Sequence, residues 1–137
     1  MNPLTAEWVA KAEADYQGVV ALNRHRKNPL PDLICFLCQQ SAEKYLKAFL
    51  QEKAVPFPKT HILTYLLRLA GSTLPGVTKL EPSLIILEDY AVKFRYPGMA
   101  ATTDQAGSAV AALRLVRRQL RKALGLTQRK LRRKDNP

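Results

Sequence analysis

Polar residues with the chemistry to hold a ligand interrupt the apolar segment CQQSAEKYLKAFL, which begins at residue 38. On a helix, Gln39 and Glu43 share one side with apolar residues. Gln40, Lys44 and Lys47 occupy the adjoining side. Glu43 and Lys47 have the spacing and order that favour an ion pair. Two interpretations stay open: a solvated helix face that carries such a pair, or a set of side chains that holds a ligand.

A second group of polar residues lies near the end of the fourth predicted helix. Arg95 can interact with the dipole at a helix C-terminus while Tyr96 packs beneath it. Alternatively, the guanidinium can bind phosphate through its paired donors, joined by Lys93 and by a lysine of the earlier helix. We therefore predict a ligand-binding set made of Lys44, Lys47, Lys93, Arg95 and Tyr96.

The motif CFLC places Cys35 and Cys38 within one helical turn. A zinc site would need two further ligands, and only His25 and His61 are available, without a second cysteine pair. A redox CxxC usually begins a helix after a strand, whereas this pair lies inside an apolar helical run. We predict buried thiols, no metal site and no cofactor.

The apolar periodicity predicts helices throughout and no strand. We expect helices over 5–23 with Thr5 as N-cap, over 32–53, over 61–71 with Thr60 as cap, from about Pro82 to the Pro97-Gly98 stop, and over 102–125 with a Thr102–Gln105 capping box. Residues 72–82 are expected to form a loop. Five helices with short connections predict an all-α up-and-down bundle of four long helices plus one short helix.

The net charge of +11 is concentrated at the C-terminal end. Residues 1–112 hold 12 Lys or Arg against 10 Asp or Glu, whereas residues 113–137 hold 10 against 1. We expect one helical domain over 1–125 and a basic, disordered tail over 126–137. This basic part can be a solvated surface, or a binding surface for RNA, a nucleotide or an acidic partner. Because no aromatic residues lie between the cations, stacking on bases is not suggested.

The composition also excludes some protein classes. Hydrophobic residues make up 47% of the chain, but no apolar run approaches the ~20 residues that cross a bilayer. The N-terminal segment carries Glu7, Glu13 and Asp15 among its apolar residues, unlike a secretory signal. We expect a soluble, cytoplasmic protein with no membrane association.

Three segments together resemble the HEPN domain, the nucleotide-binding domain of higher eukaryotes and prokaryotes. They are FLCQQSAEKYLKAFL (36–50), KTHILTYLLRLA (59–70) and FRYPG (94–98), and the likeness covers about residues 6–124. The resemblance implies a bundle of four long helices, commonly a homodimer. Some members of the family are metal-independent ribonuclease toxins. Others partner small nucleotidyltransferases in two-component defence or toxin–antitoxin systems.

The ribonuclease branch of this family uses an Arg and a His separated by four to six residues near the start of the last long helix. After Arg95, the matching positions hold Ala100, Ala101 and Thr102, which cannot transfer a proton. Metal-free RNA cleavage needs a group such as His to move protons, and Arg alone can only steady charge. We therefore predict no catalytic residues, with Arg95 and His61 as the pair to consider if the fold brings them together.

The predicted function is binding of a nucleotide or RNA phosphate by a non-catalytic HEPN protein that partners itself or a small nucleotidyltransferase. One alternative is a metal-independent ribonuclease toxin with an atypical active site. A second alternative, from a different class, is a helical protein-interaction module whose basic tail docks on an acidic protein.

Overall fold

The structure is a computed structural model that describes residues 1–25 and 27–126. Its helices are α1 (Pro3–Asn23), α2 (Pro31–Glu52), α3 (Leu63–Ala70), α4 (Val77–Glu88) and α5 (Thr103–Ala123). Two short 3-10 helices follow α3 and α4, namely η1 (Gly71–Thr73) and η2 (Asp89–Ala91). The described residues include no strand, and the predicted all-α bundle is confirmed.

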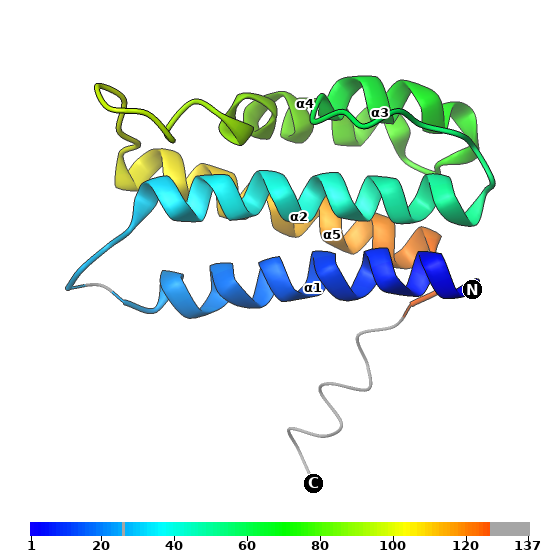
Figure 1. Ribbon diagram of the computed structural model, residues 1–137, viewed down its shortest axis with the longest axis horizontal. Coiled ribbons are helices and arrows are strands. Elements are labelled where there is room, and N and C mark those ends of the chain that lie inside the picture. The colour runs from blue at the N-terminus through cyan, green and yellow to red at the C-terminus, as the bar shows by residue number, and fades with distance from the viewer. Residues whose placement is uncertain (26, 127–137) are drawn as a thin grey trace, which may run out of the picture.

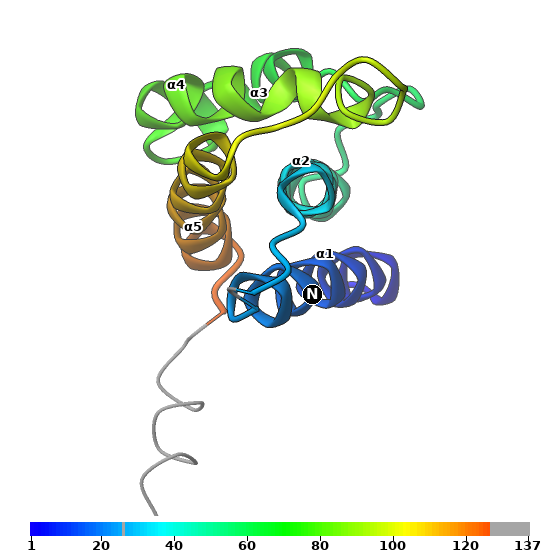
Figure 2. The same cartoon turned by 90° about the vertical axis from the view of Figure 1, so that its left-hand side faces the viewer.

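The helices pack in three layers around α2 (Figures 1 and 2). α1 covers one side of α2, α5 lies beside α2, and α3 and α4 form the layer on the other side. α1 and α2 are antiparallel, and α5 runs in the same direction as α2 (Figure 1). Because α2 contacts α1, α3, α4 and α5, most of its circumference is buried, including positions with polar side chains.

The N-terminal boundaries of two helices differ from the sequence prediction. α1 begins at Pro3 instead of Thr5, because Asn2 is the N-cap and its Oδ1 accepts a hydrogen bond from the Thr5 N–H at 2.8 Å. α3 begins at Leu63 with Ile62 at the N-cap position, and Thr60 does not cap it; the Thr60 hydroxyl accepts a hydrogen bond from the Ile62 N–H at 3.1 Å. The capping box of Thr102 and Gln105 at the start of α5 is confirmed.

Both ends of α4 differ from the sequence prediction of a helix from about Pro82 to the Pro97-Gly98 stop, since α4 ends at Glu88 and only the short η2 follows. The helix begins at Val77, so half of the predicted loop is helical and Pro82 lies inside the helix. Proline removes a helical hydrogen bond there. Leu80 and Leu84, on either side of Pro82, are both fully buried, and burial of a leucine contributes roughly 1.5–3 kcal/mol. Core packing therefore outweighs the local preference of proline for the first turn.

The two cysteines lie in the core, as predicted. Cys35 and Cys38 are buried and form no disulfide. Burial, with a smaller effect from the charge of Asp32, raises the pKa of the Cys35 thiol to about 11, and burial also raises the pKa of Cys38. Both side chains therefore behave as small apolar groups at neutral pH. Within residues 1–25 and 27–126, no group of three or more His, Cys, Asp or Glu side chains could hold a metal ion.

In the described part of the chain, none of the helices combines the length and the apolar character that a membrane span needs. The predicted tail lies outside the described residues except for Leu126, which packs against the core and whose N–H donates to the Arg121 carbonyl at 2.8 Å.

A buried ion pair joins α1 to α5. Arg117 is 6% exposed, and its Nε and Nη2 donate to the two carboxylate oxygens of Glu13 at 2.8 and 2.9 Å. Its guanidinium also stacks on the Tyr16 ring, 4.1 Å from the ring centre. One of the cations that the sequence places on the basic last helix is therefore part of the interior.

We predict that Glu13→Gln lowers the free energy of unfolding by about 1–3 kcal/mol, because it removes the charge that compensates the buried guanidinium. Urea denaturation at neutral pH measures this difference. Glu7→Gln is the matched control, since Glu7 lies exposed on the same helix. Equal stabilities of the two variants would contradict a structural role for the Glu13–Arg117 pair.

Candidate functional site

The polar residues of α2 form a hydrogen-bonded cluster around one buried carboxylate. Glu43 is 4% exposed. Its Oε1 accepts from Gln39 Nε2 at 2.9 Å and contacts His61 Nδ1 at 2.8 Å, and its Oε2 accepts from Lys47 Nζ at 2.9 Å. Glu43 and Lys47 therefore form the pair that their spacing predicted, but in the interior and not on a solvated face, while ligand binding by this set stays a prediction.

Aromatic rings and amides enclose the cluster. The Lys47 ammonium lies 5.5 Å from the Trp8 ring centre and 5.9 Å from that of Phe57. Gln39 is fully buried, and its amide also donates to the His61 backbone carbonyl at 3.2 Å. Gln40 in turn donates to the Gln39 side-chain oxygen at 2.7 Å. These bonds tie the segment between α2 and α3 to the side of α2.

His61 is the solvent-facing member of the cluster, with a side chain that is 67% exposed. An ionised carboxylate only accepts hydrogen bonds, so the contact with Glu43 requires a proton on His61 Nδ1. In the neutral ring, Nε2 is then the unprotonated atom. This arrangement of a carboxylate, an imidazole with a fixed tautomer and an accessible Nε2 is able to bind a donor or to move a proton.

The surroundings of Glu43 keep it ionised. Burial alone would raise the pKa of this carboxyl, but hydrogen bonds from Lys47, Gln39 and His61, with the Lys47 charge, outweigh burial and hold the pKa below its ordinary value. Glu43 is therefore a negative charge at neutral pH, balanced by the Lys47 ammonium at its side.

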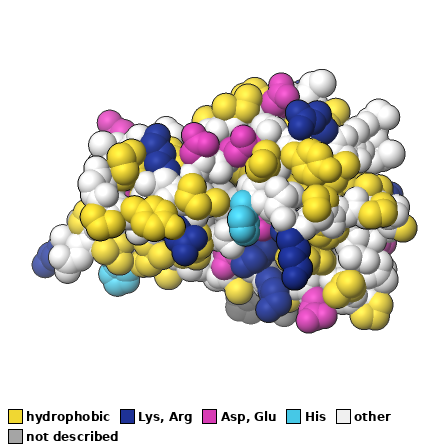
Figure 3. All heavy atoms as spheres, turned by 45° about the horizontal axis from the view of Figure 1, so that its top comes forward, with side chains coloured by type: hydrophobic (Ala, Val, Ile, Leu, Met, Phe, Trp, Pro, Cys, Tyr) yellow, Lys and Arg dark blue, Asp and Glu magenta, His cyan; other side chains and the backbone are white. Residues whose placement is uncertain are grey.

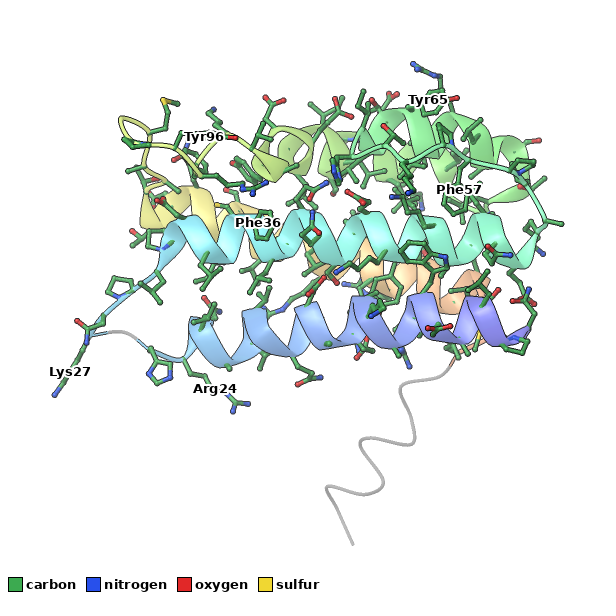
Figure 4. All side chains as sticks on the ribbon, viewed as in Figure 1. Arg24, Lys27, Phe36, Phe57, Tyr65 and Tyr96 are labelled. Carbon is green, nitrogen blue, oxygen red and sulfur yellow. The ribbon has the colours of Figure 1, made fainter. Side chains whose placement is uncertain are left out.

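A second group of predicted site residues lies nearer the start of α2. The Arg95 guanidinium sits 5.5 Å from the Phe36 ring centre, and its Nη1 lies 3.4 Å from the Ala91 carbonyl. Tyr96 is 63% exposed. Figure 4 shows Phe36 on the visible side of α2, below the segment that carries Tyr96, and Phe57 near the other end of α2, on the segment that follows this helix. Lys93, also exposed, lies 5.5 Å above the Phe94 ring centre.

The two groups share one line along α2, here called the α2 strip and made of Phe36, Gln40, Glu43 and Lys47. Spacings of four, three and four residues place these side chains on one face of the helix. Phe36 and Glu43, which contact Arg95 and His61 respectively, lie about 10 Å apart along the helix axis. Figure 3, which brings the upper layer forward, shows Lys and Arg side chains gathered next to a histidine near the middle of this face.

The predicted ligand-binding residues therefore do not converge on a single point. Lys93, Arg95 and Tyr96 lie together and exposed at one end of the strip. Lys47 is buried against Glu43 at the other end, about 16 Å along the axis from Phe36. Lys44 is directed to α1, where its Nζ lies 2.6 Å from Asp15 Oδ2. Binding roles for Lys44 and Lys47 remain predictions, and both side chains already have acidic partners.

The predicted ligand-binding set left out Gln39 and Glu43, although the sequence drew attention to both, and sequence reasoning gave Trp8 and Phe57 no role at this site. The four-residue spacing of Gln39 and Glu43 on the apolar side of α2 was the available signal, because it put a carboxylate where burial was expected. Nothing in the sequence linked either residue to His61. A separate hollow of about 200 Å³ lies near the α1–α2 connection, and none of the predicted ligand-binding residues lines it.

We predict that Glu43→Gln lowers the free energy of unfolding by about 3 kcal/mol at pH 7, since the Lys47 ammonium would stay buried without a countercharge. Urea denaturation tests this value. Glu81→Gln is the control, as Glu81 is exposed on α4 and pairs with no described cation. A loss no larger than that of the control would show that the Lys47 ammonium does not depend on this carboxylate.

The stability difference between the wild-type protein and the Glu43→Gln variant should depend on pH. Because the folded-state pKa of Glu43 is lowered, its stabilising effect is complete above the ordinary value of 4.5 and is lost as the pH falls through the folded-state pKa. The stability difference between wild type and Glu43→Gln should therefore shrink below about pH 4.5.

Comparison with known proteins places the chain in a family. The model of the HEPN domain matches residues 5–123 of the 137 residues, a range that spans α1 to α5. Neither a curated protein nor a solved structure matches. The match agrees with the resemblance carried by the three sequence segments and with the all-helical fold. The chain therefore belongs to the HEPN domain family.

Proposed function

We propose that this HEPN domain binds a nucleotide or an RNA phosphate without cleaving it, on the exposed side of the α2 strip. We further propose that it is the non-catalytic partner of a small nucleotidyltransferase in a two-component system of toxin–antitoxin or defence type. The family assignment supports a nucleotide- or RNA-related role in general. The partnership rests on the family alone.

The observation that carries the proposal is the state of Arg95. Among the described residues no carboxylate pairs with it, and its guanidinium is held against Phe36 instead. Arg95 is exposed as a residue, directly precedes Tyr96, which is 63% exposed, and lies two residues after exposed Lys93. A fixed guanidinium suits phosphate, and an exposed tyrosine ring can stack on a base. This end of the strip thus offers both kinds of contact that a nucleotide needs.

Two features support binding without cleavage. At positions 100–102, where the ribonuclease members carry a histidine after the arginine, this chain has none. The middle residue of the three, Ala101, is 9% exposed, and its N–H donates to Asp32 Oδ1 at 2.6 Å. His61 contacts Glu43, about 10 Å along α2 from the ring that holds Arg95. Among the described residues, a phosphate on Arg95 would therefore lie about two turns of α2 away from the carboxylate that contacts His61.

The apolar stripe of α5 is not available for contact with a second copy. It is buried in the chain's own core, and its buried members include Ala109, Val110, Leu113, Val116 and Leu120. Large exposed apolar side chains occur instead on α4 and just after η2, where Ile85, Ile86 and Val92 are 58%, 43% and 52% exposed. A homodimer or a nucleotidyltransferase would bury these side chains.

The ribonuclease alternative is favoured by one observation, the accessible Nε2 of His61. An imidazole oriented by a carboxylate is the arrangement that enzymes use for general acid–base catalysis. A long RNA chain could contact Arg95 and His61 at once, because the two lie along one helix face.

For nucleotide binding, we predict that Arg95→Ala raises the Kd for labelled ATP about tenfold or more, because charge-assisted bonds to phosphate contribute roughly 1.5–3 kcal/mol. Circular dichroism should show unchanged helicity. Arg68→Ala is the matched control: Arg68 is also exposed and lies 5.8 Å above the ring centre of Tyr65. Equal effects of the two substitutions would rule out a specific site at Arg95. Lys47→Ala is a poor probe, since it should also unfold the cluster around Glu43.

For RNA, we predict no cleavage above background when wild-type protein and a mixed-sequence RNA are incubated in chelator. Cleavage that is abolished by His61→Ala, and retained by His25→Ala, would replace the binding proposal with the ribonuclease alternative.

A further inference from the structure

α5 presents a row of cations on its outer side, away from the α2 strip. Arg114, Arg118 and Lys122 are all exposed and follow each other at four-residue intervals. On a helix, this interval places successive side chains on neighbouring turns, about 6 Å apart along the axis. Here the three residues are called the α5 cation row. Their neighbour Arg117 points the other way, into the interior with Glu13.

The α5 cation row has no acidic partners among the described residues. Ion pairs of α5 in residues 1–25 and 27–126 involve Arg117 and Arg121, and both use Glu13. The single acidic residue of α5, Asp104, lies in its first turn, more than two turns before Arg114. Three positive charges therefore stand on one exposed surface without local neutralisation, and the sequence continues with five more cations over 129–134.

The residues around the α5 cation row indicate whether its partner is an acidic protein or a nucleic acid. Protein interfaces have an apolar centre with aromatic or aliphatic side chains. None of the large exposed apolar residues of the described chain lies on α5, and the row is preceded on the same side by small residues, Gly107 and Ala111, both exposed. A surface with charge but no apolar anchor favours the phosphate backbone of a nucleic acid over an acidic protein.

We propose that the α5 cation row binds the phosphate backbone of single-stranded nucleic acid without reading its sequence. This site is separate from the one proposed at Arg95, because the row consists of exposed side chains of α5 while the Arg95 guanidinium lies against Phe36 of α2. Figure 2 shows α5 and α2 as two distinct helices of the bundle. It binds through charge alone. RNA and DNA of equal length should therefore bind with similar affinity.

The test is the salt dependence of binding to a mixed-sequence 20-nucleotide RNA, measured by fluorescence anisotropy with the full chain. Each phosphate contact on a single strand contributes about 0.7 to the slope of log K against log salt concentration. The triple variant Arg114→Gln, Arg118→Gln, Lys122→Gln should therefore have a slope smaller by about 2 and weaker binding at low salt. Its thermal unfolding should match wild type, since the three side chains are exposed.

A second triple variant controls for net charge. Arg24→Gln, Lys27→Gln and Lys79→Gln remove the same charge from exposed positions outside α5. This control should keep the wild-type slope. Equal slope changes in both triple variants would overturn the proposal, because they would show an effect of overall charge. A changed slope for the control variant alone would also overturn the proposal. Poly-glutamate serves as a probe for an acidic protein partner: a row variant that keeps RNA binding but loses binding to poly-glutamate would overturn the proposal in favour of such a partner.

The two nucleotide-related proposals fail separately. If Arg95→Ala leaves ATP binding intact while the α5 row variant changes the RNA slope, only the site at Arg95 is refuted. The reverse pattern refutes only the α5 row.

Discussion

A carboxylate that must stay charged inside the bundle is the constraint on which the candidate site depends. Glu43 is 4% exposed, and a buried charge is tolerated only where hydrogen bonds and an opposite charge compensate its lost hydration. Lys47, Gln39 and His61 provide that compensation. Each of them is held in place in return. The chain between α2 and α3 is thereby fastened to α2, and one imidazole is kept at the surface with a defined orientation.

The central position of α2 explains why a polar pattern became part of the interior. Helices on both faces contact it, so even its less apolar side is covered by Trp8 of α1 and by Phe57 of the following segment. Parts of the α2 strip that Trp8 and Phe57 do not cover are accessible to solvent. Arg95 and His61 lie on the two parts of the strip that remain accessible, which is why this face, and not the hollow near the α1–α2 connection, is the candidate site.

Local sequence signals were sufficient where one interaction decides the structure. The Thr102–Gln105 capping box and the apolar period of α2 predicted their elements because a cap or a stripe acts within a few residues. They failed where tertiary contacts outweigh local preference. Pro82 suggested a helix start, yet burial of Leu80 extends α4 back to Val77. Likewise, the sequence predicted that Glu43 and Lys47 form a pair, but not that the pair is buried. Its environment depends on His61 and Trp8, which are 18 and 35 positions away from Glu43 in the sequence, and no local pattern reveals such contacts.

The orientation of the His61 ring tests this account most directly. The chain has only two histidines, so nitrogen-detected NMR of the imidazoles at a pH where they are neutral can assign each ring. We expect His61 to carry its proton on Nδ1 in the wild-type protein, and a Glu43→Gln variant to lose this preference. A wild-type His61 ring protonated mainly on Nε2 would show that Glu43 does not hold it, and would contradict the account.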